Sequence, residues 1–170
     1  MLIFRNIRDL KLNYKNNLIE MDGTKKTILD DLGSLIRFKI KATSARTHKI
    51  LLFGPPGAGK TSIAQHLHKK FGLVPVSVAR LLLDQINRKT EVGKEVADSY
   101  KSGKLVSDEI VYGLLKSRLE QADCRLHGYV LEGFPKNPNQ LGMMEKLELR
   151  LRPHYYVNLD CSDDVKIDFF

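Results

Sequence analysis

The sequence predicts an α/β fold, in which a parallel sheet is covered by helices on both faces. Along residues 48–170, short and nearly continuous apolar segments alternate with stretches whose apolar residues repeat at helical spacing. Strands that are apolar throughout are typical of parallel sheets buried on both faces. A glycine-rich segment directly after the first of these strands supports the same class, because such folds bind ligands at the carboxyl ends of their strands.

Length and composition allow one domain with a substantial core. Hydrophobic residues make up 42% of the 170 residues and charged residues 28%, as is ordinary for a soluble globular protein. No apolar run approaches the roughly 18 residues of a membrane span, and no signal-peptide pattern opens the chain, so we expect a cytoplasmic protein without a membrane partner. Cys124 and Cys161 are far apart and lack metal-site spacing, which favours free thiols.

The net charge of +8 is concentrated near the start of the chain. Residues 1–50 hold 11 Lys or Arg against 5 acids and so contribute +6. There is no dense basic run and no RNA-binding aromatic motif, so the sequence does not favour a nucleic-acid partner.

A small polar stretch at residues 43–47 divides the chain and is interpreted as a linker. Before it, in residues 1–42, a strand is predicted over 16–21, followed by a turn and helix cap at Asp22-Gly23-Thr24. The helical spacing of Ile28, Leu32, Leu35 and Ile36 then predicts a helix over about 26–38.

After the linker, residues 48–170 form the main unit. The apolar segments predict strands over 49–53, 73–78, 129–131 and 155–159. Helices are predicted after residue 59, over 80–87 and over 109–121. The inward-facing residues of the first are predicted to be Ile63, Leu67 and Phe71, and those of the last Ile110, Leu114 and Leu115.

Residues 54–61, Gly-Pro-Pro-Gly-Ala-Gly-Lys-Thr, match the phosphate-binding pattern G-x-x-x-x-G-K-[ST] in full. The glycines let backbone N–H groups turn toward phosphate oxygens, and the following helix adds its positive end. Lys60 can reach the outer phosphates, and the Thr61 hydroxyl can ligate Mg²⁺. A glycine-rich turn without a ligand is the weaker interpretation, because the motif also lies between a predicted strand and a helix. The sequence therefore predicts a nucleoside triphosphate site of the P-loop NTPase type.

A second feature covers residues 128–140, where a buried strand leads into a turn. The strand brings Glu132 to the edge of the sheet beside the phosphate loop, where a carboxylate can hold the water shell of a metal. Gly133 and Pro135 predict a tight turn that leaves Lys136 and Gln140 pointing into the same crevice. The alternative is an ordinary strand-to-loop turn with a solvated lysine.

Three segments, residues 57–62, 101–110 and 128–140, resemble successive signatures of the adenylate kinase family, in its order and at its approximate spacing. The resemblance implies phosphoryl transfer from Mg-ATP to a nucleoside monophosphate, usually AMP. By motif position, the ATP phosphates would be held by Gly57, Ala58, Gly59, Lys60, Thr61 and Ser62. The monophosphate would be held by Lys104, Leu105, Val106, Gly133, Phe134, Pro135, Lys136 and Gln140. Lys60 and Lys136 are the candidate catalytic residues, and Thr61 and Glu132 the candidate metal ligands.

The leading segment resembles a different part of the same family. Residues 14–36 are similar to the last strand and last helix of an adenylate kinase fold, yet here they precede the phosphate loop. The chain is either a slice of a tandem protein or a circular permutation whose leading strand completes the same sheet. We favour the slice, because tandem domains occur in the cilium-associated adenylate kinase 8 type and residues 119–124 are similar to that subtype. This implies a location in the cilium or axoneme and protein partners in a larger assembly.

The sequence departs from the family pattern on the monophosphate side. Val78 and Leu83 stand where the family carries Thr and Arg, and Arg80 replaces an acid nearby. Unless Arg80 or Arg88 substitutes, one charge-assisted hydrogen bond to the monophosphate is missing, typically worth about 1.5–3 kcal/mol.

Further departures bear on catalysis. Lys136 replaces an arginine and cannot make its two-pronged contact, and Glu132 replaces an aspartate, adding one methylene. The family's lid and transition-state arginines are expected after Phe170, so we expect this chain to lack the lid region, and an arginine finger can be worth about 10³–10⁵ in rate. Two functions follow: adenylate kinase-type phosphoryl transfer, or a catalytically impaired nucleotide-binding module that serves structurally in a larger, ciliary assembly.

Overall fold

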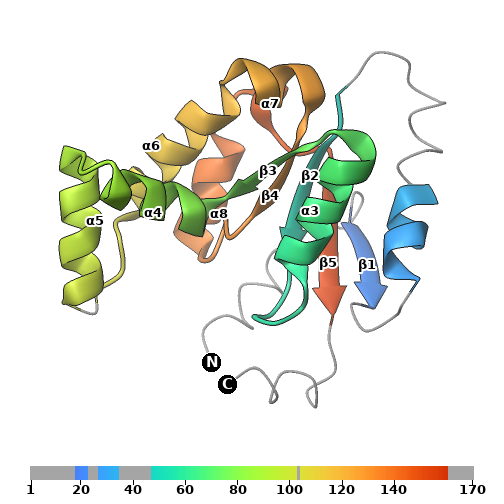
Figure 1. Cartoon of the computed structure of the whole chain (residues 1–170), viewed down its shortest axis with the longest axis horizontal. Coiled ribbons are helices and arrows are strands. Elements are labelled where there is room, and N and C mark those ends of the chain that lie inside the picture. Colours follow the sequence, from blue (N-terminus) through green and yellow to red (C-terminus); the bar gives the residue numbers. More distant parts are fainter. Residues whose placement is uncertain (1–17, 23–26, 35–46, 103, 161–170) are drawn as a thin grey trace.

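A computed structural model describes residues 18–22, 27–34, 47–102 and 104–160 of the chain. Its centre is a sheet of five parallel strands in the order β1-β5-β2-β4-β3 (Figure 1). The strands are β1 Leu18–Asp22, β2 Lys49–Phe53, β3 Val74–Ser77, β4 Tyr129–Glu132 and β5 Tyr155–Asp160. The parallel α/β architecture predicted from the sequence is therefore confirmed.

Helices connect and cover the strands. They are α3 Lys60–Phe71, α4 Val78–Asn87, α5 Glu91–Lys101, α6 Asp108–Leu119, α7 Ala122–His127 and α8 Pro138–Glu145, with a short 3-10 helix at Leu149–Leu151. Residues 28–34 form a further helix, the unlabelled blue ribbon beside β1 in Figure 1. Among the described residues, no helix is both long and apolar enough to cross a membrane.

Strand β2 is buried along its whole length because it packs on both faces. On one face, Leu51 and Phe53 belong to a cluster formed with α4, α6 and α8. On the other, Ile50 and Leu52 pack with α3 and with residues 28–34. This two-sided packing explains why the strand is apolar without alternation.

The leading strand is the edge strand of the same sheet. Leu18 lies opposite Tyr156, and Met21 lies opposite Leu159 of β5, which in turn pairs with β2. The leading strand thus lies in the same sheet as the phosphate loop, while the origin of the chain as a slice of a tandem protein stays a prediction. The predicted linker lies outside the described residues except for Thr47, as do residues 16–17 of the predicted strand and residues 26 and 35–38 of the predicted helix.

Most predicted elements form close to their expected bounds, but one helix faces the core differently. The buried residues of α6 are Val111, Leu115 and Leu119, so the predicted inward set was right only for Leu115. Ile110 and Leu114 are partly buried at the margin of the cluster. The structure also adds α5, α7 and α8, which the sequence analysis did not predict.

Candidate active site

A pocket of ≈ 340 Å³ opens at the carboxyl ends of β2, β3 and β4, which is within the range of about 300–1,000 Å³ typical of ligand clefts. Its wall comes from the loop after β2, the junction of β3 and α4, and the turn after β4. The lining residues are Leu52, Phe53, Gly54, Pro56, Lys60, Thr61, Ser77, Ala79, Glu132, Gly133, Phe134, Pro135 and Lys136. The predicted phosphate loop and the predicted turn therefore share one pocket.

The loop is seated tightly against the sheet at its first glycine. Gly54 has φ +146°, and a Cβ on it would lie 2.4 Å from the carbonyl oxygen of Leu159 in β5. No larger residue fits there without moving backbone. Helix α3 then begins at Lys60 without a side-chain cap on its first turn, so its backbone N–H groups and positive end face an incoming anion.

The side chain of Lys60 folds back onto the phosphate loop. Its Nζ donates hydrogen bonds to the carbonyl oxygens of Gly54, at 3.0 Å, and Pro55, at 2.6 Å. Burial lowers the pKa of Lys60, the Glu132 carboxylate opposes this shift, and the nearby Lys136 ammonium adds to it, leaving the pKa below its ordinary value. The two candidate catalytic lysines are thus electrostatically coupled across the pocket.

Thr61 and Glu132 meet directly. The Thr61 hydroxyl lies 3.0 Å from each carboxylate oxygen of Glu132. Glu132 is 7% exposed and stands opposite Leu52 at the end of β4, next to the strand that carries the loop. A hydroxyl and a carboxylate are the hard oxygen donors that Mg²⁺ prefers, and Mg²⁺ is commonly held by one or two such groups together with phosphates and water. The two residues therefore fit the predicted metal.

Only some of the residues predicted to hold the monophosphate line the pocket. Gly133, Phe134, Pro135 and Lys136 line the pocket, and the Phe134–Pro135 peptide bond is cis. Gln140 is buried behind them, with its amide oxygen accepting a hydrogen bond from the backbone N–H of Lys136 at 2.7 Å. Lys104, Leu105 and Val106 do not line the pocket, and Leu105 is 94% exposed.

The junction of β3 and α4 contributes residues that the sequence analysis did not single out. Ser77 and Ala79 line the pocket between the phosphate loop and Lys136. Val78, one of the two departures from the family pattern, is buried in the core. Leu83, the other, is 51% exposed and lies one helical turn beyond Ala79 on the same side of α4.

A comparison with protein-family models matches residues 52–168 to adenylate kinase. The chain belongs to the adenylate kinase family. The match begins in the strand that carries the phosphate loop and covers the turn at Glu132, so the residues that line the pocket lie within the matched nucleoside monophosphate kinase-type domain. Its substrate class is ATP and a nucleoside monophosphate.

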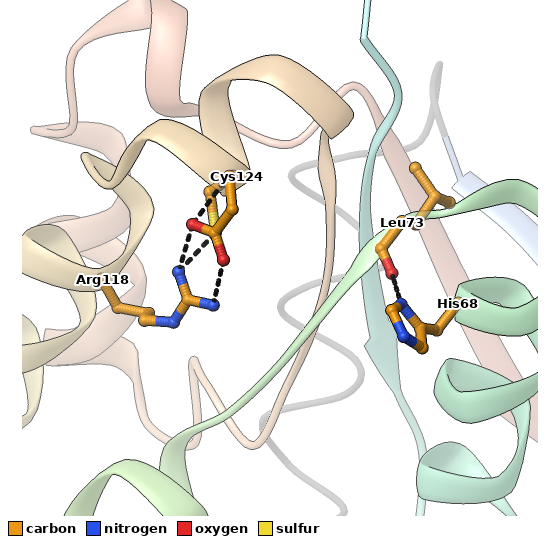
Figure 2. Close-up of polar contacts among 5 residues, drawn as sticks. His68, Leu73, Arg118 and Cys124 are labelled. Atoms are coloured by element: carbon orange, nitrogen blue, oxygen red, sulfur yellow. Dashed lines mark hydrogen bonds and ion pairs between the residues drawn. The ribbon is translucent and has the colours of Figure 1, made fainter.

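Two polar contacts outside the pocket stabilise the elements of this adenylate kinase domain (Figure 2). The Arg118 guanidinium donates two hydrogen bonds to the Asp123 carboxylate, both at 2.8 Å, and a third to the sulfur of Cys124. Burial raises the pKa of the Cys124 thiol to about 11, so this free cysteine is a protonated core residue at neutral pH. At the end of α3, a ring nitrogen of His68 lies 2.9 Å from the carbonyl oxygen of Leu73.

Proposed function

We propose that this domain transfers the γ-phosphoryl group of Mg-ATP to AMP. The observation that carries the proposal is the convergence of Lys60, Thr61, Glu132 and Lys136 on one pocket at the carboxyl edge of the sheet. Phosphoryl transfer depends on positioning and charge neutralisation, and these four side chains supply both from opposite walls.

The donor side is built to hold a triphosphate. The backbone N–H groups of the loop and the start of α3 bind the phosphates, and Lys60 moves from the carbonyl oxygens of Gly54 and Pro55 onto the outer phosphates. Thr61 and Glu132 would hold Mg²⁺, which would neutralise part of the phosphate charge when it is bound.

The acceptor side supplies the second positive charge. Lys136 lines the same pocket as Lys60, so that two ammonium groups are available to neutralise the charge of the transferred phosphoryl group. An oxygen of the monophosphate attacks the γ-phosphorus in line as the bond to the β-phosphate oxygen breaks, giving two diphosphates without a covalent enzyme intermediate. AMP is proposed as the acceptor because the family resemblance implies it.

A coupled assay of ADP formation from ATP and AMP tests this function. Lys60→Ala is expected to abolish both ATP binding and turnover, because it removes the cation of the phosphate loop. Lys69→Ala, an exposed lysine on the same helix, should leave both unchanged. Turnover that persists in Lys60→Ala would contradict the assignment.

A second function is favoured by one observation on α4. Where the family pattern has Thr and Arg, this chain has a buried Val78 and a half-exposed Leu83, and the exposed Arg80 and Arg88 do not line the pocket. These substitutions fit a nucleotide-binding module with impaired catalysis, for which the sequence resemblance implies a structural role in a larger, ciliary assembly. ATP binding without ADP formation would favour this module over the enzyme.

A further inference from the structure

One carboxylate joins the start of α6 to the start of α8, which follows the turn after β4. Asp108, the first residue of α6, accepts hydrogen bonds from the side-chain amides of Asn137, at 3.1 and 3.3 Å, Asn139, at 2.7 Å, and Gln140, at 2.6 Å. The three donors lie 29 to 32 residues further along the chain. Asp108 therefore gathers the three amide side chains at the start of α8 around a single charge.

The contact with Gln140 determines which way its amide faces. The amide nitrogen donates to the Asp108 carboxylate, and the amide oxygen accepts from the backbone N–H of Lys136 at 2.7 Å. In the reversed orientation, a carbonyl would face a carboxylate and an amide would face an N–H donor, so both contacts would become repulsive. Asp108 is thus linked through Gln140 to the backbone of a residue in the pocket wall.

Helix capping alone does not account for this arrangement. Ser107 already caps α6 by accepting a hydrogen bond from the backbone N–H of Ile110, and Glu109 supplies a further negative charge to the first turn. Burial raises the pKa of Asp108, but the hydrogen bonds from the amides of Asn139, Gln140 and Asn137 outweigh it and leave this pKa below its ordinary value. The group therefore remains an ionised acceptor at neutral pH.

We propose that Asp108 is a positioning residue for the acceptor side of the site, which fixes the amide of Gln140 and, through it, the loop at Lys136. The inference rests on the proposed function, because it assumes that this loop binds a nucleoside monophosphate. Loss of Asp108 weakens binding of the monophosphate and leaves ATP binding intact, since none of the hydrogen bonds of this network is made to the phosphate loop or to α3.

The test is calorimetric titration of the 170-residue chain with AMP and, separately, with ATP. Asp108→Asn keeps the size of the side chain but turns an amide NH₂ toward the amide donors at the start of α8. It is expected to weaken AMP binding about tenfold, the typical effect of losing a charge-assisted hydrogen bond, and to change ATP affinity less than about twofold. Glu109→Gln removes the same charge from the same helical turn outside the network and should change neither affinity.

A double-mutant cycle with Gln140→Ala distinguishes positioning from a general effect on stability. If Asp108 acts through Gln140, the double variant binds AMP about as weakly as Gln140→Ala alone. Additive losses, or an equal loss of ATP binding, would overturn the inference. If circular dichroism shows Asp108→Asn to be unfolded, Asp108→Ser, which suits the first helical turn, takes its place with the same expected loss.

The two levels of the proposal fail in different ways. Wild-type chain that binds ATP but no monophosphate would overturn the proposed function and, with it, the role of Asp108. If the wild-type chain binds AMP and Asp108→Asn binds it with unchanged affinity, only the positioning role is overturned.

Discussion

Leu83→Arg is expected to tighten AMP binding by about 10- to 100-fold. The position lies one turn beyond Ala79, which lines the pocket, so a long side chain on this side of α4 can extend to the monophosphate. Leu83 is 51% exposed, so its removal costs little core packing. A charge-assisted hydrogen bond contributes about 1.5–3 kcal/mol, and each 1.4 kcal/mol is tenfold in affinity.

Titration calorimetry with AMP measures the effect directly, and ATP affinity serves as the internal reference. Leu126→Arg is the matched control, because it adds the same charge at a 70% exposed leucine on α7, which does not line the pocket. An unchanged AMP affinity in a folded Leu83→Arg chain would refute the reasoning. An equal gain in Leu126→Arg would refute it too, because the gain would then come from net charge.

Three further predictions concern stability and reactivity. A Cβ at Gly93 would lie 2.0 Å from a backbone oxygen of α4. Gly93→Ala should therefore lower the free energy of unfolding, measured by urea titration, by about 1–3 kcal/mol. Gly113 has open space around it, so Gly113→Ala should raise the free energy of unfolding by roughly 0.5–1 kcal/mol. Hydrogen bonds from Arg118 lower the pKa of Asp123, so this pair stabilises the fold above about pH 4 and loses that contribution as the pH falls further. The free energy of unfolding should therefore differ less between pH 7 and pH 3 in Arg118→Gln than in the wild-type chain. Because burial raises the pKa of Cys124 to about 11, peptide mapping after alkylation at pH 7 should find this thiol protected in the native chain and labelled in urea.

The donor half of the site could be predicted from the sequence because it is contiguous. A single stretch from Gly54 to Thr61 carries the loop, its lysine and its hydroxyl, and strand β2 before it forms with the predicted bounds. Helix α8 carried a signal that could also have been used, because Pro138 follows an Asn137 cap at its start. Helix α5 carried one as well, because Thr90 caps it and Val92, Val96 and Tyr100 recur at helical spacing, with Val96 buried in the core.

The acceptor half could be predicted only in part because it is assembled from distant segments. The spacing predicts that Lys136 and Gln140 share a crevice, but only Lys136 lines the pocket. Gln140 is turned toward Asp108, 32 residues earlier, by a hydrogen bond that no local pattern encodes. In the same way, the exposure of Leu83 depends on how α4 packs against its neighbours and not on its own sequence.

The position of the leading strand extends the same argument to the phosphate loop. Gly54 rests on the backbone of Leu159, so the geometry of the loop depends on where β5 lies. Met21 of β1 pairs with that same residue from the other side, and β1 thereby fixes the outer edge of β5. A strand pairs through its backbone whatever its order along the chain, so a segment that precedes the loop can support it as well as one that follows. The geometry of the phosphate loop therefore depends on β5, and β1 is the strand that pairs with the outer edge of β5.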